Sequence, residues 1–296
     1  MSPTGIEIPS LTPGSTEWLR TMSASKVGAV MGTSPYDSPF SLWHRMAGDL
    51  GQQEQTAVMS RGHYLEPGIL AWFADQHPDF LTVKGGCWSH WNNELWTASP
   101  DGITHRIDSD DWSVLEVKTA ADDLGWGRAG TDEVPPGYRD QCLWQMLVVG
   151  VERCHVAVLL PFLEFREYVI DWHDERIGEI VHAVELFMDS LHTGQQPPLD
   201  DHAATYVALR GMHPEIDPID VALDLDTARE FCQAKAMSKY AKSREQGAVN
   251  AVADAMGTAR RALYAGDVIA TRTSRGDGVP YVKAAASLPD FLEVSA

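Results

Sequence analysis

Residues 113–120, SVLEVKTA, place two charged side chains in the middle of an otherwise apolar strand. Successive side chains of a strand point to opposite faces, so Glu116 and Lys118 share one face and Val117 points the other way, into the core. Burying a glutamate and a lysine among apolar side chains costs free energy, which favours a role for the two groups in binding or chemistry. The segment therefore indicates a strand inside a covered sheet, with polar chemistry on one face.

The rest of the chain alternates helical and strand patterns between about residues 16 and 192. Apolar spacing and capping residues predict helices over residues 24–31, 39–47, 61–76, 136–149 and 174–192. Runs rich in β-branched and aromatic residues predict strands over residues 85–91, 94–99, 113–120, 154–161 and 165–172. In the last helix the residues expected to face inward are Ile177, Ile180, Val184, Leu186 and Phe187. This order predicts an α/β fold with a central mixed β-sheet flanked by helices.

Composition and apolar spacing also predict how the chain divides into domains. We expect an N-terminal tail over residues 1–15, a main domain over 16–192, a linker over 193–218 and a smaller C-terminal segment over 219–296. The linker is rich in Gly, Pro and acidic residues. In the C-terminal segment, apolar spacing predicts a helix over about 227–265, and VIATRT and VPYVKA predict a hairpin joined by SRGDG.

The net charge of −19 comes from 23 basic and 42 acidic residues, and taken alone it argues against nucleic acid as a partner. The charge is unevenly distributed, however. Residues 1–205 carry 12 basic and 30 acidic residues, whereas residues 229–275 carry nine basic and four acidic residues. The positive excess of 229–275 makes that stretch a candidate for contacts with DNA, a partner protein or another subunit, and a packing appendage with solvated charges is the alternative.

Several other classes of protein fit the sequence poorly. The four cysteines, Cys87, Cys142, Cys154 and Cys232, have no C-x-x-C spacing, which disfavours zinc or iron–sulfur ligation. The first residues lack a signal-peptide pattern, and no apolar run approaches the roughly 18 residues needed to span a bilayer. We therefore expect a soluble, cytoplasmic protein without membrane contact.

Asp101 adds a second carboxylate to the pattern. It lies in a Pro–Asp–Gly turn at the end of one strand, 15 residues before Glu116 on the next. Two carboxylates and the backbone carbonyl of Val117 can bind a hard cation such as Mg²⁺ through oxygen. The metal would polarise a phosphodiester and lower the pKa of a bound water, and Lys118 could orient or deprotonate that water. This combination predicts phosphodiester hydrolysis.

The Glu–x–Lys pair alone is a common pattern, and a solvated ion pair on an amphipathic strand explains it as well. The combination with neighbouring segments is more specific. A helix carrying Glu66 precedes Asp101, and a later helix carries Gln141 and Gln145 on one face at four-residue spacing.

Five segments together resemble the lambda-exonuclease or YqaJ-type viral recombinase family, within the PD-(D/E)xK nuclease superfamily. They are WLRTMSASKVGAVMG, RGHYLEPGIL, TASPDG, LEVKTA and YRDQCLWQMLVVG, which cover about residues 18–150 in the family's order. The resemblance implies a restriction-endonuclease-like core. It also implies that Asp101 and Glu116 are metal carboxylates, that Lys118 is the catalytic lysine, that Glu66 is the helix glutamate near the metal, and that Gln141 completes the site.

The resemblance further implies a pocket for a 5′-terminal phosphate. Ser25 resembles the serine of that pocket, and Arg20 resembles its arginine, although the spacing between them is shorter than in the family. Helix capping alone would also explain Ser23 and Ser25. The two interpretations are compatible, because a helix N-terminus attracts phosphate.

The function implied by the resemblance is a Mg²⁺-dependent exonuclease of phage recombination type, in which Mn²⁺ can substitute. It would digest linear double-stranded DNA from 5′ to 3′ and leave 3′ single-stranded tails for a single-strand annealing protein. A homo-oligomer is expected, with a ring trimer as one arrangement. The alternatives are an endonuclease or repair nuclease of the same superfamily and, from another class, a non-catalytic DNA-binding module.

Overall fold

The computed structural model describes residues 2–51, 55–285 and 287–289. The chain forms two compact units, Met1–Ile216 and Asp217–Ala296. Residues 286 and 290–296 of the expected C-terminal segment lie outside the described residues. No helix in the described part of the chain is both long and apolar enough to cross a bilayer.

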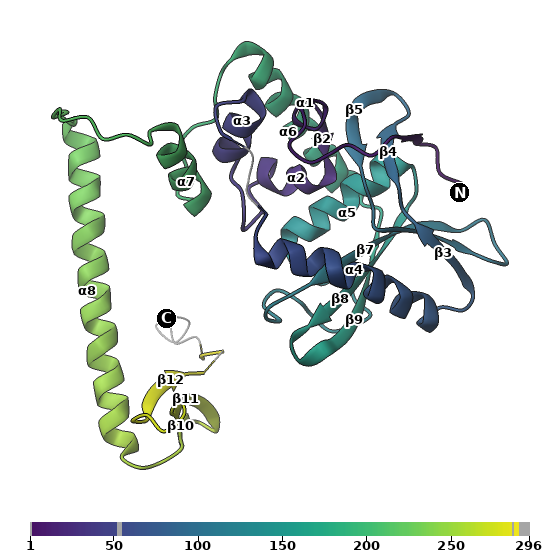
Figure 1. The fold of residues 1–296 in the computed structure, drawn as a ribbon. Helices are drawn as coiled ribbons and strands as arrows, with labels where there is room; N and C mark the ends of the chain where they lie inside the picture. Colours follow the sequence, from purple (N-terminus) through teal and green to yellow (C-terminus); the bar gives the residue numbers. More distant parts are fainter. Residues whose placement is uncertain (1, 52–54, 286, 290–296) are drawn as a thin grey trace. The chain divides into compact units, whose positions relative to one another are not determined.

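A five-stranded sheet forms the centre of the first unit, in the order β3-β6-β7-β8-β9 (Figure 1). The strands are β3 (Phe80–Lys84), β6 (Gly102–Arg106), β7 (Trp112–Thr119), β8 (Arg153–Leu160) and β9 (Glu164–Asp171). β7 and β8 are parallel and the other neighbours are antiparallel. The α/β fold expected from the sequence, with a central mixed sheet flanked by helices, is confirmed.

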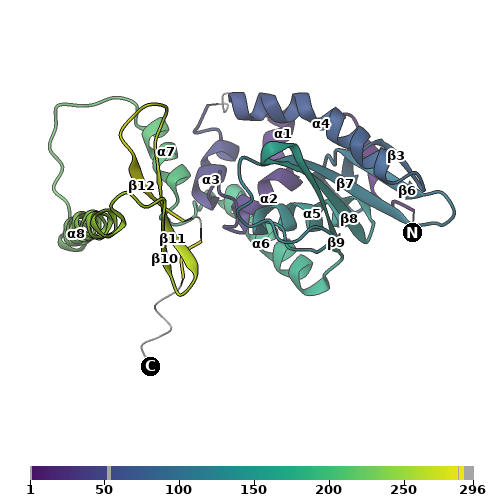
Figure 2. The same cartoon turned by 90° about the horizontal axis from the view of Figure 1, so that it is seen from below.

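Helices cover both faces of this sheet, as Figure 2 shows. On one face, Ile69 and Phe73 of α4 (Ala57–Gln76) pack against Leu115, Val117 and Ala157. The other face carries α5 (Pro136–Val149), the crossover between the parallel strands β7 and β8. Three further helices pack behind α5 around the larger core: α2 (Ala24–Val30), α3 (Pro39–Ala47) and α6 (Asp174–Thr193). Val117 therefore faces the core under α4, and Glu116 faces α5, as the period of the strand predicts.

A second, four-stranded sheet lies in the same unit, in the order β1-β4-β5-β2. Its strands are β1 (Ile6–Ile8), β4 (Cys87–His90), β5 (Asn93–Ala98) and β2 (Met22–Ser23), and α1 (Thr16–Arg20) precedes β2. β1 comes from the segment expected to be a tail. β2 runs parallel to β5 with Ser23 opposite Thr97, so the start of α2 lies beside the chain that leads into Asp101.

Several elements of the first unit differ from those expected. β3 and β6 were not predicted, because both are short and β6 directly follows a turn signal. The helix expected from residue 61 begins at Ala57. Leu186 is exposed rather than buried, because it lies off the stripe that Ile177, Ile180, Val184 and Phe187 form at helical spacing.

The segment expected to be a linker contains helix α7 (Ala203–Met212), which packs on α3. His202 caps α7 by accepting a hydrogen bond from the backbone N–H of Ala204, and the hydroxyls of Thr205 and Ser38 lie 2.6 Å apart. Because Gly and Pro are frequent on both sides of α7, local composition predicted a linker here and not a helix.

The second unit consists of a long helix and a small sheet. Asp224 caps α8 (Leu225–Met256), which is followed by β10 (Arg261–Tyr264), β11 (Asp267–Thr273) and β12 (Tyr281–Ala284), all antiparallel. The expected hairpin is confirmed as β11 and β12. The helix expected to reach residue 265 ends at Met256, because Gly257 at its C-terminus adopts a left-handed φ, and Leu263 belongs to β10.

Candidate active site

Asp101 lies in the turn between β5 and β6, at the point where β6 begins beside β7. Its Oδ2 accepts a hydrogen bond of 2.6 Å from the backbone N–H of Val117. The backbone N–H of Gly85 donates to the Asp101 carbonyl at 3.1 Å. A Cβ on Gly85 would lie 2.1 Å from the carbonyl oxygen of Pro100, so only glycine permits this approach. The turn that aims Asp101 at β7 is thus held by its own backbone neighbours.

Glu116 is only 3% exposed, and both of its carboxylate oxygens have partners on α5. Gln141 Nε2 donates to Oε1 at 2.6 Å, and Gln145 Nε2 donates to Oε2 at 2.6 Å. The four-residue spacing of the two glutamines puts both amides on the face of α5 that covers the strand. The helix therefore compensates the cost of burying the charge and fixes the orientation of the carboxylate.

Lys118 lies beside Glu116 on the same face of β7. Its Nζ donates to Glu116 Oε1 and, at 3.2 Å, to Gln141 Oε1, and it lies 4.8 Å from the centroid of the Tyr138 ring. Burial lowers the pKa of Lys118, but the charges of Glu116 and Asp101 outweigh burial and raise it above its usual value. In this state Lys118 is a cation that neutralises Glu116 rather than a base.

Nearby positive charge does not fully compensate the burial of the Asp101 carboxyl and its repulsion by Glu116. Burial, and then the charge of Glu116, raise the pKa of Asp101 to about 8, against the opposing effects of Lys118 and of the Val117 N–H. The charge of Glu66 on α4 also raises this pKa, so the half-buried Glu66 is close enough to act on Asp101. A bound cation would relieve the repulsion among these carboxylates.

The donors at this position suit a hard cation. The carboxylates of Asp101 and Glu116 supply oxygen, and the carbonyl of Val117 points to the same side of β7 as its N–H, towards Asp101. Among the described residues, no three His, Cys, Asp or Glu side chains lie together closely enough to hold a metal ion. Any such ion would thus depend on the Val117 carbonyl and on water as well, which is typical of Mg²⁺.

The structure places Ser23 and Ser25 at the start of α2 and Arg20 at the end of α1. Ser23 makes no side-chain capping bond. Its hydroxyl oxygen lies 3.2 Å from that of the exposed Ser25 instead. Within the described chain, no hydrogen bond or ion pair is found for the exposed Arg20 side chain. Because β2 pairs with β5, these residues lie on the side of the domain where the chain enters the Asp101 turn.

Two neighbours of these sites were missed by the sequence analysis. Lys26 is buried, and its Nζ donates to the carbonyls of Trp18 at 2.5 Å and Thr21 at 2.6 Å, which joins α1 to α2. Burial, and then the charge of Arg45, lower the pKa of Lys26 to about 7. The position of a lysine on the apolar face of an otherwise small-residue helix could have signalled it.

Tyr138 is the other neighbour, on the first turn of α5. Its ring lies next to Lys118, and its hydroxyl oxygen is 3.3 Å from that of Tyr36. Burial, and then the hydrogen bond with Tyr36, raise the pKa of Tyr138 to about 12, so its hydroxyl keeps its proton at neutral pH. Only the packing of α5 against the loop before α3 could reveal this pair.

Comparisons with known proteins show a match to one family over part of the chain. Residues 17–152 match the sequence model of the YqaJ-like viral recombinase domain. A search of curated proteins gave no match. The resemblance inferred from the five sequence segments is confirmed over this range.

Three solved structures are also similar to parts of the chain. An alkaline exonuclease from Laribacter hongkongensis is 22% identical over 67% of this chain and 96% of its own, with a TM-score of 0.47. A phage-related exonuclease from Haemophilus somnus 129PT is 14% identical over 60% of this chain and 96% of its own, with a TM-score of 0.43. A putative exonuclease from Eubacterium rectale is 17% identical over 74% of this chain and 97% of its own, also with a TM-score of 0.43.

Proposed function

We propose, from the match of residues 17–152 to the YqaJ-like viral recombinase domain, that this chain is a metal-dependent DNA nuclease of phage recombination type. The observation that carries the proposal is the group formed by the buried Glu116 and the half-buried Asp101 and Lys118. Two carboxylates share one low-dielectric position, and a single lysine partly offsets their charge. Such an arrangement is costly for stability alone and is useful when a cation and a phosphodiester bind.

Asp101, Glu116 and the carbonyl of Val117 would hold Mg²⁺ or Mn²⁺, with Glu66 close by. When bound, the metal polarises the scissile phosphate and lowers the pKa of an attacking water. Gln141 and Gln145 hold the Glu116 carboxylate in one orientation, so the metal position is preorganised. Lys118 would leave Glu116 when the metal binds and would offset the charge that develops on the phosphate.

The substrate is linear double-stranded DNA, digested from 5′ to 3′ to leave 3′ single-stranded tails. Ser25 and Arg20 would bind the terminal 5′ phosphate. The exposed Ser25 hydroxyl and the Arg20 guanidinium, unengaged within the described chain, support this role, because both are available to a ligand. The product tails suit a single-strand annealing protein as partner, and a homo-oligomer such as a ring trimer would suit processive digestion.

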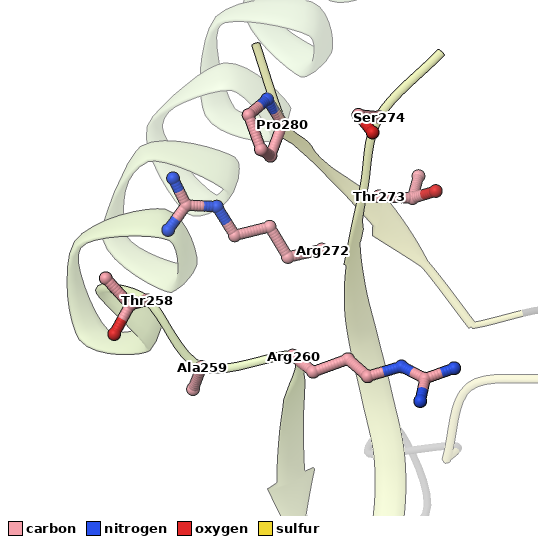
Figure 3. Close-up of a pocket in the computed structure, with 7 residues that line it drawn as sticks. All are labelled: Thr258, Ala259, Arg260, Arg272, Thr273, Ser274 and Pro280. Carbon is pink, nitrogen blue, oxygen red and sulfur yellow. The ribbon is translucent and has the colours of Figure 1, made fainter. Parts of the chain in front are cut away.

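The second unit would supply phosphate contacts in addition to those of the acidic first unit. Arg260 and Arg272 line a shallow cavity of about 530 Å³ together with the hydroxyl residues Thr258, Thr273 and Ser274. Figure 3 shows the two guanidinium groups pointing away from one another, which suits separate contacts along a DNA backbone rather than one small anion.

The experiment that tests the proposal compares linear duplex with 5′-phosphate or 5′-hydroxyl ends and closed circular duplex, each with Mg²⁺, Mn²⁺ or a chelator. We expect metal-dependent loss of the linear DNA, faster with 5′ phosphates, and intact circles. Cleavage of circles as fast as linear DNA would favour the endonuclease alternative. DNA binding without cleavage in any metal would favour the non-catalytic module.

A further inference from the structure

Tyr36 presents an aromatic ring to solvent next to the candidate active site. The residue is 68% exposed, although it lies in the turn between α2 and α3 and not in an extended loop. Its hydroxyl pairs with that of Tyr138 at 3.3 Å, and the Tyr138 ring in turn lies against Lys118. The side chain of Tyr138 thus connects the exposed ring to the lysine beside Glu116.

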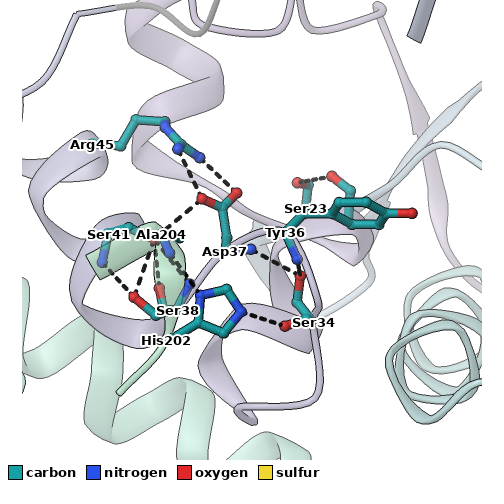
Figure 4. Close-up of polar contacts among 10 residues, drawn as sticks. Ser23, Ser34, Tyr36, Asp37, Ser38, Ser41, Arg45, His202 and Ala204 are labelled. Carbon is teal, nitrogen blue, oxygen red and sulfur yellow. Dashed lines mark hydrogen bonds and ion pairs between the residues drawn. The ribbon is translucent and has the colours of Figure 1, made fainter. Parts of the chain in front are cut away.

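The backbone that carries this ring is held on several sides (Figure 4). The Ser34 hydroxyl accepts hydrogen bonds from the N–H of Tyr36 at 3.1 Å and of Asp37 at 3.2 Å. Both carboxylate oxygens of Asp37 bind the guanidinium of Arg45 at 2.8 Å. The turn is therefore fixed before any ligand binds.

Neighbouring elements hold the same turn from outside. The ring Nε2 of His202, which precedes α7, lies 3.2 Å from the Ser34 carbonyl. Thr33 donates its hydroxyl to Asp140 of α5 at 2.7 Å, and Asp140 is itself held by the guanidinium of Arg176 at 2.8 and 2.9 Å. The turn is thus tied to α5, the helix that also carries Gln141 and Gln145.

A rigid, exposed aromatic ring has little to contribute to the stability of its own domain. Its exposed area remains in water, and its fixed backbone and paired hydroxyl leave few rotamers to lose when a ligand packs on it. A flat apolar face with those properties is suited to stacking on another flat group. The flat groups of a DNA substrate are its nucleobases, and Tyr138 links Tyr36 to Lys118, beside which the strand would be cut.

From this geometry we propose that Tyr36 stacks on a nucleobase of the strand that is being cut, close to the scissile phosphate. This role rests on the proposed nuclease function and deepens it. Stacking on a base is insensitive to sequence, because every base has an aromatic face. The contact would hold one unpaired nucleotide at the active site whatever its identity, as a processive enzyme requires.

The test measures binding and cleavage separately. The probes are 5′-phosphorylated duplexes labelled with fluorescein at the far end, either intact or with one abasic site at the first, second or third nucleotide from the 5′ end. Binding is measured by anisotropy with Ca²⁺ in place of Mg²⁺, and cleavage with Mg²⁺. The variants are Tyr36→Ala, Tyr36→Phe and, as a matched control, Tyr206→Ala, since Tyr206 is 66% exposed on α7.

We expect one abasic position to weaken binding by the wild type about tenfold, the typical effect of losing one base–aromatic stack. Tyr36→Ala should weaken binding to intact DNA by a similar factor and should no longer distinguish that abasic probe. Tyr206→Ala should behave like the wild type, and Tyr36→Phe, which keeps the ring, should stay much closer to the wild type than Tyr36→Ala does. In cleavage, Tyr36→Ala should raise KM more than it lowers kcat.

The proposal is overturned if Tyr36→Ala still loses affinity for the same abasic probe as the wild type does. It is also overturned if Tyr36→Phe is as impaired as Tyr36→Ala, because the hydroxyl link to Tyr138 would then be the important feature. A protein that shows the expected base discrimination but never cuts overturns the nuclease function and keeps the stacking. A protein that cuts DNA but does not distinguish the abasic probe overturns the stacking and keeps the nuclease function.

Discussion

The backbone N–H of Val117 donates a hydrogen bond of 2.6 Å to the carboxylate of Asp101. Because the antiparallel strand β6 starts directly after Asp101, Val117 lies on a part of the β7 edge that β6 does not cover. The carbonyl of Val117 points to the same open edge, so the two residues bring three oxygen atoms to one place. The candidate metal position thus results from the point at which a neighbouring strand begins.

Replacement of either carboxylate should abolish cleavage. We expect Asp101→Asn and Glu116→Gln to lower the rate by at least ~10²-fold while the fold is kept, because the metal and the developing charge lose their ligands. Lys118→Ala should lower kcat more than metal affinity. Rates on linear duplex and Mg²⁺ titrations would measure this, with Glu185→Gln at an exposed position of α6 as the control. Wild-type rates in Glu116→Gln would contradict the site.

Gln145 should stabilise the metal-free protein through Glu116. Gln145→Leu keeps most of the volume of this fully buried side chain but removes the donor to Oε2, leaving a buried carboxylate oxygen unsatisfied. We expect a loss of about 1–3 kcal/mol in the free energy of unfolding, measured with urea. The loss should shrink in a Glu116→Gln background, where no charge needs the amide. An equal loss in both backgrounds would assign the effect to packing.

Lys26 should make stability depend on pH. Its pKa is about 7 in the folded chain against the ordinary lysine value of 10.5, so between these values the unfolded chain holds a proton that the folded chain has released. The free energy of unfolding should therefore rise with pH from about 7 to 10.5, relative to Lys26→Met. Urea unfolding at several pH values would measure the difference, with Lys235→Met as an exposed control. A difference that is constant with pH would show that Lys26 stays charged.

Gly85→Ala should impair the candidate active site indirectly, by moving Asp101. The new Cβ would lie 2.1 Å from the Pro100 carbonyl oxygen, so the turn before β6 must shift and Asp101 with it. We expect a loss of about 1–3 kcal/mol in stability and a reduced Mg²⁺-dependent rate. Gly178→Ala is the matched control, because nothing lies within 4 Å of its Cβ position on α6. Equal behaviour of the two variants would show that the turn adapts.

The basic groups of the second unit should contribute to DNA affinity and not to chemistry. We expect Arg260→Gln with Arg272→Gln to weaken binding and to reduce the dependence of log K on log salt by up to ~2, because two phosphate contacts are lost. Cleavage at saturating DNA should be unchanged. Arg153→Gln, at an exposed ion pair with Asp171 in the first unit, serves as control. An unchanged salt dependence would exclude these arginines from the DNA contact.

The sequence by itself determined the features that depend on local backbone geometry. The period of a strand placed Glu116 and Lys118 on one face and Val117 in the core. The 3.6-residue turn placed Gln141 and Gln145 together, and Ser38, Pro39 and Gly48 marked both ends of α3. These relations involve residues a few positions apart, and the backbone allows few alternatives to them.

Only the tertiary structure decided which groups meet. The Val117 N–H reaches Asp101 because β6 begins at Gly102, and Gln145 reaches Glu116 because α5 crosses over β7. The pairing of Tyr36 with Tyr138 joins residues 102 positions apart. The helix within residues 193–218 likewise depends on its packing against α3. Such contacts result from how strands and helices stack around a shared core, and local periodicity carries no information about that arrangement.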